Sequence, residues 1–160
     1  MSWAHIHLAL NHVPVIGILL AVLLLGIALL RQKYELQRTS YWLIAGLALL
    51  ALLVYLTGEP AEELVEGLPG YSEALVEHHE EVALIATIGM AVAGLAAAVA
   101  LVRGRRQVTP GASTYPWVVL LLAVGVAGLM LWTANLGGQI RHSEIRSTSA
   151  AAPSVAAERD

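Results

Sequence analysis

Long runs of apolar residues, separated by short polar segments, dominate this chain. Four runs contain no charged residue, and they cover residues 13–30, 42–56, 82–102 and 117–136. A helix of about 20 apolar residues crosses the roughly 30 Å hydrocarbon core of a bilayer. The second run is shorter, but Ser40, Tyr41 and Thr57 can extend it into the interfaces. The pattern therefore predicts four transmembrane helices, approximately at residues 12–31, 40–57, 79–103 and 116–136.

The composition agrees with a membrane environment. Of the 160 residues, 58% are apolar and 13% are charged, against about 25% charged residues in a typical soluble domain. The first run lacks a preceding basic segment and a small-residue cleavage site, so we expect a retained span and not a signal peptide. The fold expected is an all-α integral membrane four-helix bundle at residues 1–146. The Ala- and Ser-rich tail at residues 147–160 is expected to be disordered.

Lys and Arg are distributed unevenly among the predicted loops. The first and third loops contain Arg31, Lys33, Arg38, Arg103, Arg105 and Arg106. The second loop has eight Glu and no Lys or Arg. Because basic residues are enriched in cytoplasmic loops, both termini are predicted to lie on the outer, non-cytoplasmic side of the membrane. Arg141 and Arg146 lie on the outer side against this rule.

The second loop has a helical pattern of its own. Glutamates recur at helical spacing over residues 59–66 and oppose small or apolar residues. We expect a short amphipathic helix after Pro60, with a solvated acidic face, which Gly67, Pro69 and Gly70 then end. From Tyr71 a second helical pattern runs directly into the third span.

Small residues recur within the third and fourth spans. They are Ala86, Gly89, Ala93 and Ala97 in the third span, and Gly125 and Gly128 in the fourth. Such residues allow membrane helices to approach closely, and we expect that role here. The weaker interpretation is that they leave room for a flat macrocycle.

All of the histidines fall at the outer ends of the predicted spans. The six are His5, His7, His12, His78, His79 and His142. An imidazole near a membrane is costly to bury unless it is neutral and partnered, and neutral imidazole is a common metal ligand. The alternative is that the histidines bind no cofactor and only cap helix ends or contact water. The clustering favours a metal or cofactor site near the outer face.

Helical geometry constrains how these histidines can cooperate. His7 and His12 would point about 140° apart and lie roughly 7.5 Å apart along a helix axis, so they would serve different sites. Pro14 permits a helix to begin nearby, with Asn11 or His12 as its N-terminal cap. His5 and His7 can then lie on a separate re-entrant or interfacial segment.

The remaining histidines complete the set of candidate ligands. Adjacent His78 and His79 would diverge by about 100° on a helix, so only one is expected to face the bundle. The resulting order of candidate ligands is His12, His79, His142, His7, and then His78 and His5.

Several kinds of site can be excluded from the residues. Cysteine is absent, which excludes disulfides, thiolate metal sites and iron–sulfur ligation by this chain. The Glu-x-x-His pairs of dimetal bundles and the HExxH zinc motif do not occur, and no pattern indicates nucleotide or nucleic-acid binding. Histidines from different spans, with Arg141 near enough to pair with a propionate, fit b-type haem. Copper or zinc fits the same residues, so both remain open.

The chain resembles a bacterial four-helix membrane family of unknown function. The segment His7-Leu-Ala-Leu-Asn-His12-Val-Pro14 is similar to its HxxxxHxP opening motif, and the resemblance covers roughly residues 5–146. Further similar features are Thr57-Gly58, a histidine opening the third span, and Thr133-Ala-Asn-Leu-Gly137-Gly138 before a final histidine. The resemblance implies a cytochrome b-like protein, which some members combine with Rieske-type domains. It also implies that the ligands are His7, His12, His79 and His142.

These observations predict a membrane b-type cytochrome with one or two haems near its outer face. Chain order and diagonal packing suggest that His12 pairs with His79 and that His7 pairs with His142. The expected function is one-electron transfer between a periplasmic redox protein, such as a c-type cytochrome or Rieske domain, and a membrane partner. That role is closer to a carrier subunit than to an enzyme. The alternatives are a copper, zinc or iron binding or transfer protein, and a structural accessory subunit of a larger membrane redox complex.

Overall fold

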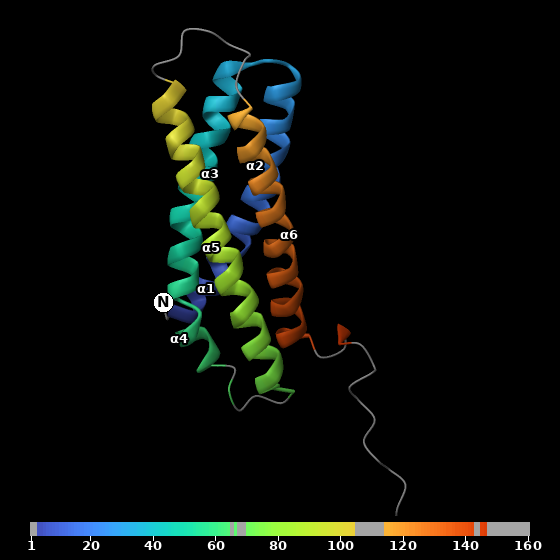
Figure 1. The fold of residues 1–160 in the computed structure, drawn as a ribbon. Helices are drawn as coiled ribbons and strands as arrows, with labels where there is room; N and C mark the ends of the chain where they lie inside the picture. Colours follow the sequence, from blue (N-terminus) through green and yellow to red (C-terminus); the bar gives the residue numbers. More distant parts are fainter. Residues whose placement is uncertain (1–2, 65, 67–69, 105–113, 143–144, 147–160) are drawn as a thin grey trace, which may run out of the picture.

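The computed structural model describes residues 3–64, 66, 70–104, 114–142 and 145–146. Over these residues the chain is helical, with four long helices and two short ones (Figure 1). The helices are α1 (Trp3–Leu10), α2 (His12–Leu30), α3 (Tyr34–Leu56), α4 (Glu59–Glu62), α5 (Glu73–Gly104) and α6 (Tyr115–Arg141). The predicted disordered tail lies outside the described residues. So do Arg105, Arg106 and part of the predicted break after α4, Gly67 and Pro69.

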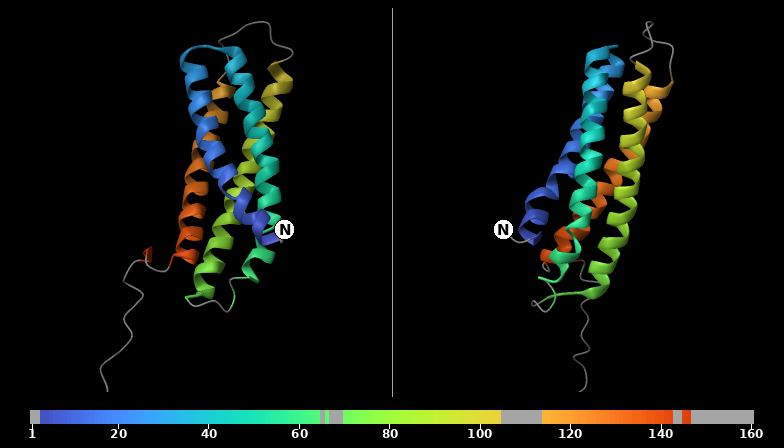
Figure 2. Two further views of the ribbon diagram at one scale, coloured as in Figure 1. Left: turned by 180° about the vertical axis from the view of Figure 1, so that it is seen from behind. Right: turned by 90° about the vertical axis from the view of Figure 1, so that its left-hand side faces the viewer.

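The four long helices run side by side as one bundle (Figures 1 and 2). Each of α2, α3, α5 and α6 contacts two of the others, in the cyclic order α2, α3, α5, α6. Each long helix is also long and apolar enough to cross a membrane. Large apolar side chains cover their outward faces; Leu53 is 58% exposed and Leu121 is 70% exposed. Such a continuous apolar surface needs lipid around it, and the chain is a multi-pass membrane protein.

The helices extend further than the predicted spans. Helix α3 begins at Tyr34, α5 begins at Glu73, and α6 continues to Arg141. A prediction from apolar runs counts only the residues inside the hydrocarbon core, whereas a helix can continue into the polar interface. At the start of α5, Glu73 lies in the first turn, where a carboxylate is favoured by the helix dipole.

Small residues on α5 let it pack closely against its neighbours. Ala93 and Ala97 are fully buried. A Cβ on Gly94 would overlap the Cβ of Ala48 on α3, and one on Gly89 would lie 3.2 Å from a methyl group of Val126 on α6. The predicted packing role is thus confirmed for the third span, where Gly94 adds to the expected residues.

The same prediction is wrong for the fourth span. A Cβ on Gly125 or Gly128 would meet no atom within 4 Å. The buried residues of α6 include Ala123, Ala127 and Met130, which share one face at helical spacing. Gly125 and Gly128 fall outside this face and are exposed.

The first span carries a short helix at its N-terminal end. Helices α1 and α2 are separated only by Asn11, whose backbone is itself in the right-handed helical region (φ −58°, ψ −29°). Pro14 has no N–H, so the carbonyl of Leu10 cannot receive the usual helical hydrogen bond from it. Contrary to the expected cap, Asn11 makes no side-chain capping bond. His5 and His7 therefore lie on a nearly continuous extension of the first span (Figure 2), and α1 packs against α4.

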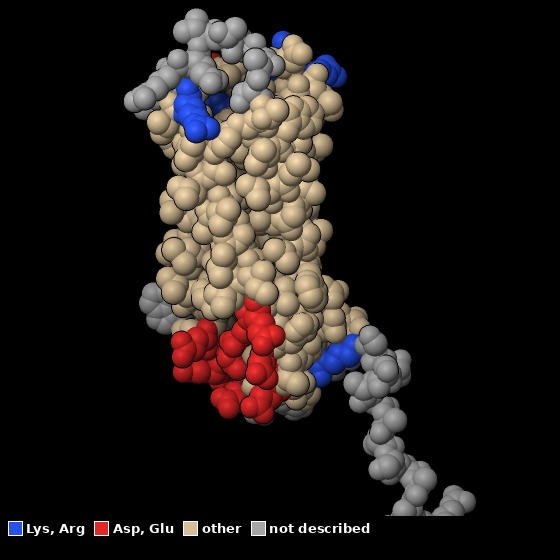
Figure 3. Space-filling model, in the orientation of Figure 1, with Lys and Arg blue, Asp and Glu red and all other residues tan. Residues whose placement is uncertain are grey.

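Charged residues are segregated at the two ends of the bundle (Figure 3). Carboxylates gather at the end that holds α4 and the start of α5, and Lys and Arg lie at the opposite end. A further basic patch adjoins the C-terminal end of α6, where Arg141 and Arg146 lie. Helix α4 itself begins before Pro60, at Glu59, and is only four residues long, so the acidic helix is shorter than the sequence pattern indicated.

Candidate functional site

The end of the bundle with the glutamates also holds the histidines, and His7 is held there by the end of α3. Its Nδ1 atom lies 3.1 Å from the carbonyl oxygen of Val54 and 3.2 Å from Oγ1 of Thr57. A carbonyl oxygen can only accept a hydrogen bond, so Nδ1 of His7 carries the proton. In the neutral form of this ring, Nε2 is the unprotonated nitrogen, whose lone pair can bind a metal.

The carbonyl of Val54 lies in the last turn of α3, which ends at Leu56. The last carbonyls of a helix lack their usual partners, and that of Val54 accepts the backbone N–H of Thr57 at 3.1 Å. The Thr57 hydroxyl donates to the same carbonyl at 2.7 Å and is buried. Thr57 and Val54 together therefore fix the position of the His7 ring on α1 relative to α3.

His79 is oriented in the same way on the other side of the bundle. Its Nδ1 atom lies 3.1 Å from the carbonyl oxygen of Thr133, so this contact joins α5 to α6. Gly137 is one turn after Thr133, and a Cβ there would lie 3.2 Å from Cε1 of His79. The absence of a side chain at Gly137 gives the imidazole access to the carbonyl. Nδ1 is again the protonated nitrogen and Nε2 the free one.

Both imidazoles lie at the same end of the bundle, on different helices. His7 and His79 are both half-buried. Each donates a hydrogen bond from Nδ1 to a backbone carbonyl. Histidines that bind a metal through one ring nitrogen commonly make such a bond with the other, and it orients the ring. Chain order suggested the pairs His12 with His79 and His7 with His142; of these four residues, His7 and His79 are half-buried and His12 and His142 are exposed.

His78 lies differently from the adjacent His79. It is exposed, its ring meets the edge of the Trp132 ring with centroids 5.7 Å apart, and its Nδ1 lies 3.9 Å from a carboxylate oxygen of Glu81. The prediction that only one of the two histidines faces the bundle is therefore confirmed, and that residue is His79.

The other predicted ligands lie at the surface. His12 is the first residue of α2 and is exposed, and His5 on α1 is exposed as well. His142 follows the last residue of α6 and is exposed, with its backbone N–H donating to the carbonyl of Gly138 at 2.9 Å. Arg141, the expected propionate partner, is exposed in the last turn of α6.

Arg146 caps the C-terminal end of α6. Its Nε donates to the carbonyl of Gln139 at 2.8 Å, and one terminal nitrogen donates to the carbonyl of Ile140 at 3.2 Å. These carbonyls belong to the last turn of α6, where a cation is favoured by the helix dipole. Arg146 thus closes the end of the helix that carries Thr133 and Gly137.

The acidic residues form a polar surface beside α1. The Tyr71 hydroxyl donates to a carboxylate oxygen of Glu62 at 3.4 Å. Partial burial, followed by the charges of Glu62, Glu66 and Glu73, raises the pKa of the Tyr71 phenol above its ordinary value. The phenol therefore stays protonated and links the segment after α4 to α4 itself. Because α4 packs on α1, this negative surface adjoins the helix that carries His7.

The donor set restricts what the site can bind. Within the described ranges, no group of three or more His, Cys, Asp or Glu side chains is arranged to hold a metal ion. Two neutral imidazoles on different helices fit the axial positions of a haem iron. They also suit a copper ion, whereas protein zinc sites use at least three protein ligands.

Sequence reasoning selected the histidines but not the residues that orient them. Thr133 and Gly137 are four residues apart, a spacing that places them on one face of a helix, and this spacing is the signal that could have found them. Val54 has no such signal, because its contribution is a backbone carbonyl. Only the position at which α3 ends places that carbonyl in the last turn of the helix.

Comparison with known proteins gives a single family. The family model described as "Predicted membrane protein (DUF2231)" matches residues 4–145. That range includes all four long helices and every histidine. No curated protein and no solved structure matches the chain.

Proposed function

We propose, for a chain that belongs to this family of predicted membrane proteins, that His7 and His79 hold a b-type haem and that the protein relays single electrons. The observation that carries the proposal is the matched orientation of the two rings. Each donates from Nδ1 to a backbone carbonyl, Val54 in one case and Thr133 in the other. Each therefore has Nε2 free as a neutral ligand.

The residues around the imidazoles support this role by limiting their motion. The Thr57 hydroxyl and the Val54 carbonyl hold His7, and Gly137 allows His79 to lie against α6. A ligand whose orientation is set before binding loses less entropy when the cofactor enters. Haem, when bound, supplies an iron that accepts and gives up one electron.

The glutamates indicate what kind of redox partner suits the site. Negative side chains gather on one side of the bundle end that holds α4 and the start of α5 (Figure 3), the end at which His7 and His79 lie. A surface of one sign accelerates the encounter with a partner of opposite sign. The partner proposed is a periplasmic redox protein with a positively charged docking surface, of the c-type cytochrome or Rieske class. The location proposed is the bacterial inner membrane with periplasmic termini.

Absorption spectra of the detergent-purified protein test the proposal. Expressed with ample haem, the wild type should show a sharp Soret band and split visible bands on reduction with dithionite. His7→Ala and His79→Ala should each lose the low-spin spectrum, because each removes one axial ligand. His78→Ala is the matched control, being adjacent to His79 but exposed, and should keep it. A wild type that binds no haem, or unchanged spectra in both ligand variants, would contradict the proposal.

The haem-to-protein ratio tests the larger ligand set. His12 and His142, with Arg141 near a propionate, remain the proposed residues of a second haem. A wild-type ratio near two that falls to one in both His12→Ala and His142→Ala would support that second site. A ratio of one, unaffected by either substitution, would limit the protein to the pair His7 and His79.

A second candidate function is copper binding or transfer at the same pair of histidines. The acidic surface beside α1 favours it, because carboxylates concentrate cations near a site. Metal analysis of the detergent-purified proteins used for the absorption spectra separates the two functions. Stoichiometric copper that disappears in both His7→Ala and His79→Ala, without any haem spectrum, would support copper handling. A wild type without haem or metal, captured stoichiometrically in a complex, would instead indicate a structural accessory subunit.

A further inference from the structure

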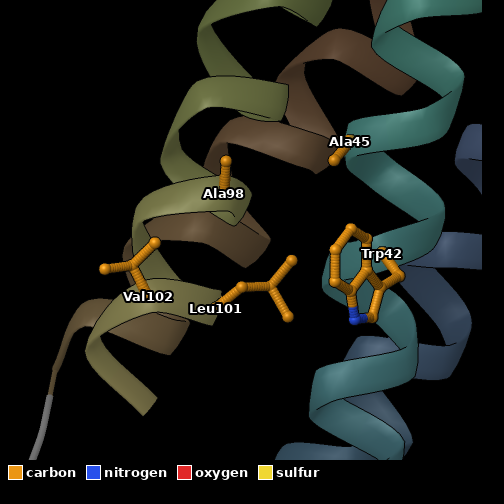
Figure 4. Close-up of a pocket in the computed structure, with 5 residues that line it drawn as sticks. All are labelled: Trp42, Ala45, Ala98, Leu101 and Val102. Carbon is orange, nitrogen blue, oxygen red and sulfur yellow. The ribbon is translucent and has the colours of Figure 1, made fainter. Parts of the chain in front are cut away.

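An apolar groove lies between α3 and α5 at the end of the bundle opposite the histidines. It encloses about 180 Å³ and is lined by Trp42, Ala45, Ala98, Leu101 and Val102. Trp42 and Ala45 come from α3, and the other residues come from α5 (Figure 4). Trp42 is 55% exposed and Val102 is 58% exposed, so the groove opens on the lipid-facing side of the bundle.

The packing of α3 against α5 gives the groove one closed end. Gly94 and Ala48 touch so closely that a Cβ on Gly94 would overlap the Ala48 side chain. Ala98 and Ala45 lie about one helical turn further toward the basic end, four residues after Gly94 and three before Ala48. There the helices leave an open space that Trp42 and Leu101 border (Figure 4). The groove therefore runs from the Gly94 contact toward the basic end of the bundle.

A basic side chain stands at the open end. Arg38 lies four residues before Trp42 on α3, which places it on the same helix face and about 6 Å further toward the basic end. It is exposed, and the described residues offer it no ion-pair partner. Arg103 is nearer to α6, since its guanidinium lies 5.1 Å from the centre of the Tyr115 ring. Of these two described arginines, Arg38 is thus the one on the groove side of its helix.

We propose that this groove binds one anionic phospholipid of the surrounding bilayer. An acyl chain lies between Ala45 and Ala98 and ends against the Gly94–Ala48 contact. The phosphate meets Arg38 at the polar interface, and the amphipathic Trp42 ring borders the chain near headgroup level. Charge complementarity selects an anionic headgroup, because basic side chains at the membrane surface attract such lipids. This site is independent of the histidine pair and of the proposed electron transfer.

Native mass spectrometry of the full chain, released from nanodiscs that contain equal amounts of phosphatidylglycerol and phosphatidylcholine, tests the proposal. Wild-type protein should retain one phosphatidylglycerol after other lipids have been stripped. Ala98→Leu fills the groove and should reduce this retention by about tenfold. Ala91→Leu makes the same change at an exposed position on α5 outside the groove and should retain the lipid as the wild type does.

Arg38→Gln provides a second variant that leaves the apolar packing intact. It should weaken the preference for phosphatidylglycerol by about fivefold, the loss expected for one basic residue near a membrane surface. Equal retention by Ala98→Leu and Ala91→Leu would overturn the proposal. So would equal retention of the two lipids by the wild type, or an isoprenoid chain in place of the phospholipid in protein isolated from native membranes.

Discussion

Thr133 and Gly137 lie one helical turn apart on α6, and together they receive the imidazole of His79. The ring packs on the bare backbone of Gly137 and donates to the Thr133 carbonyl. His78, its neighbour in the chain, points toward Trp132 and Glu81 instead. The role of a single residue therefore depends on which face of its helix it occupies. The adjacent histidines His78 and His79 lie on different faces and make different contacts.

Gly137→Ala should weaken haem binding. The new Cβ would lie 3.2 Å from Cε1 of His79, so the ring must shift and its hydrogen bond to Thr133 weakens. A lost hydrogen bond of about 1 kcal/mol corresponds to roughly fivefold lower affinity. The free energy of unfolding should change little. Alanine is favoured over glycine in a helix by up to about 1 kcal/mol, and this gain offsets the weakened hydrogen bond. Haem titration followed by absorbance measures the affinity.

Gly138→Ala is the control for this experiment. Its Cβ would meet only Ile145, at an ordinary contact distance of 3.9 Å. Haem affinity should therefore equal that of the wild type. If the two alanine variants bind haem equally well, the packing of His79 on Gly137 is unimportant for the ligand.

At the scale of elements, contact between α3 and α5 depends on Gly94. The predicted small residues of α5 do pack, but Gly125 and Gly128 of α6 face away from every other helix. Helices α5 and α6 both contain small residues at helical spacing, so the sequence alone could not tell which of these residues lie at a helix contact. The rotation of each helix about its own axis decides which glycine is at a contact, and that rotation is set by the whole core.

Gly94→Ala should destabilise the bundle, and Gly125→Ala should not. The added methyl group on Gly94 would overlap Ala48, and overpacking of this kind costs about 1–3 kcal/mol. The same substitution at Gly125 meets open space and should raise stability by up to about 1 kcal/mol through helix propensity. Reversible unfolding in mixed detergent micelles measures both. Equal free energies of unfolding for the two variants would show that the α3–α5 contact tolerates the extra volume.

At the scale of the whole molecule, the charges define two different ends. Glutamates surround the histidine end, and the described Lys and Arg residues of the α2–α3 loop and the end of α5 lie at the other (Figure 3). The positive-inside rule assigns the basic end to the cytoplasm. The proposed redox site would then face the periplasm, and the lipid groove would open in the cytoplasmic leaflet.

The absence of cysteine allows a direct test of this orientation. Glu63 lies at the histidine end and Glu35 lies at the basic end, and both residues are exposed. Each is replaced by cysteine in a separate variant. A membrane-impermeant maleimide should label Glu63→Cys in intact spheroplasts and label Glu35→Cys only after lysis. The reverse pattern would place the histidines in the cytoplasm and rule out a periplasmic redox partner.

The sequence alone determined the four helices, their membrane environment and the gathering of histidines at one end. These properties follow from the length and hydropathy of local segments and from the alternation of spans, so no knowledge of side-chain contacts is needed. It also singled out His7 and His79 as candidate ligands, although not the backbone carbonyls that orient them.

Only the tertiary structure decided how His7 and His79 are anchored. The position of His7 depends on the nearly continuous run of α1 into α2, which brings α1 against α4, and on the end of α3, where the Val54 carbonyl lies. The position of His79 depends on the rotation of α5 that turns it toward Gly137. Each of these is a relation between helices distant in the chain. Helical periodicity fixes angles within one helix and is silent about the angles between two.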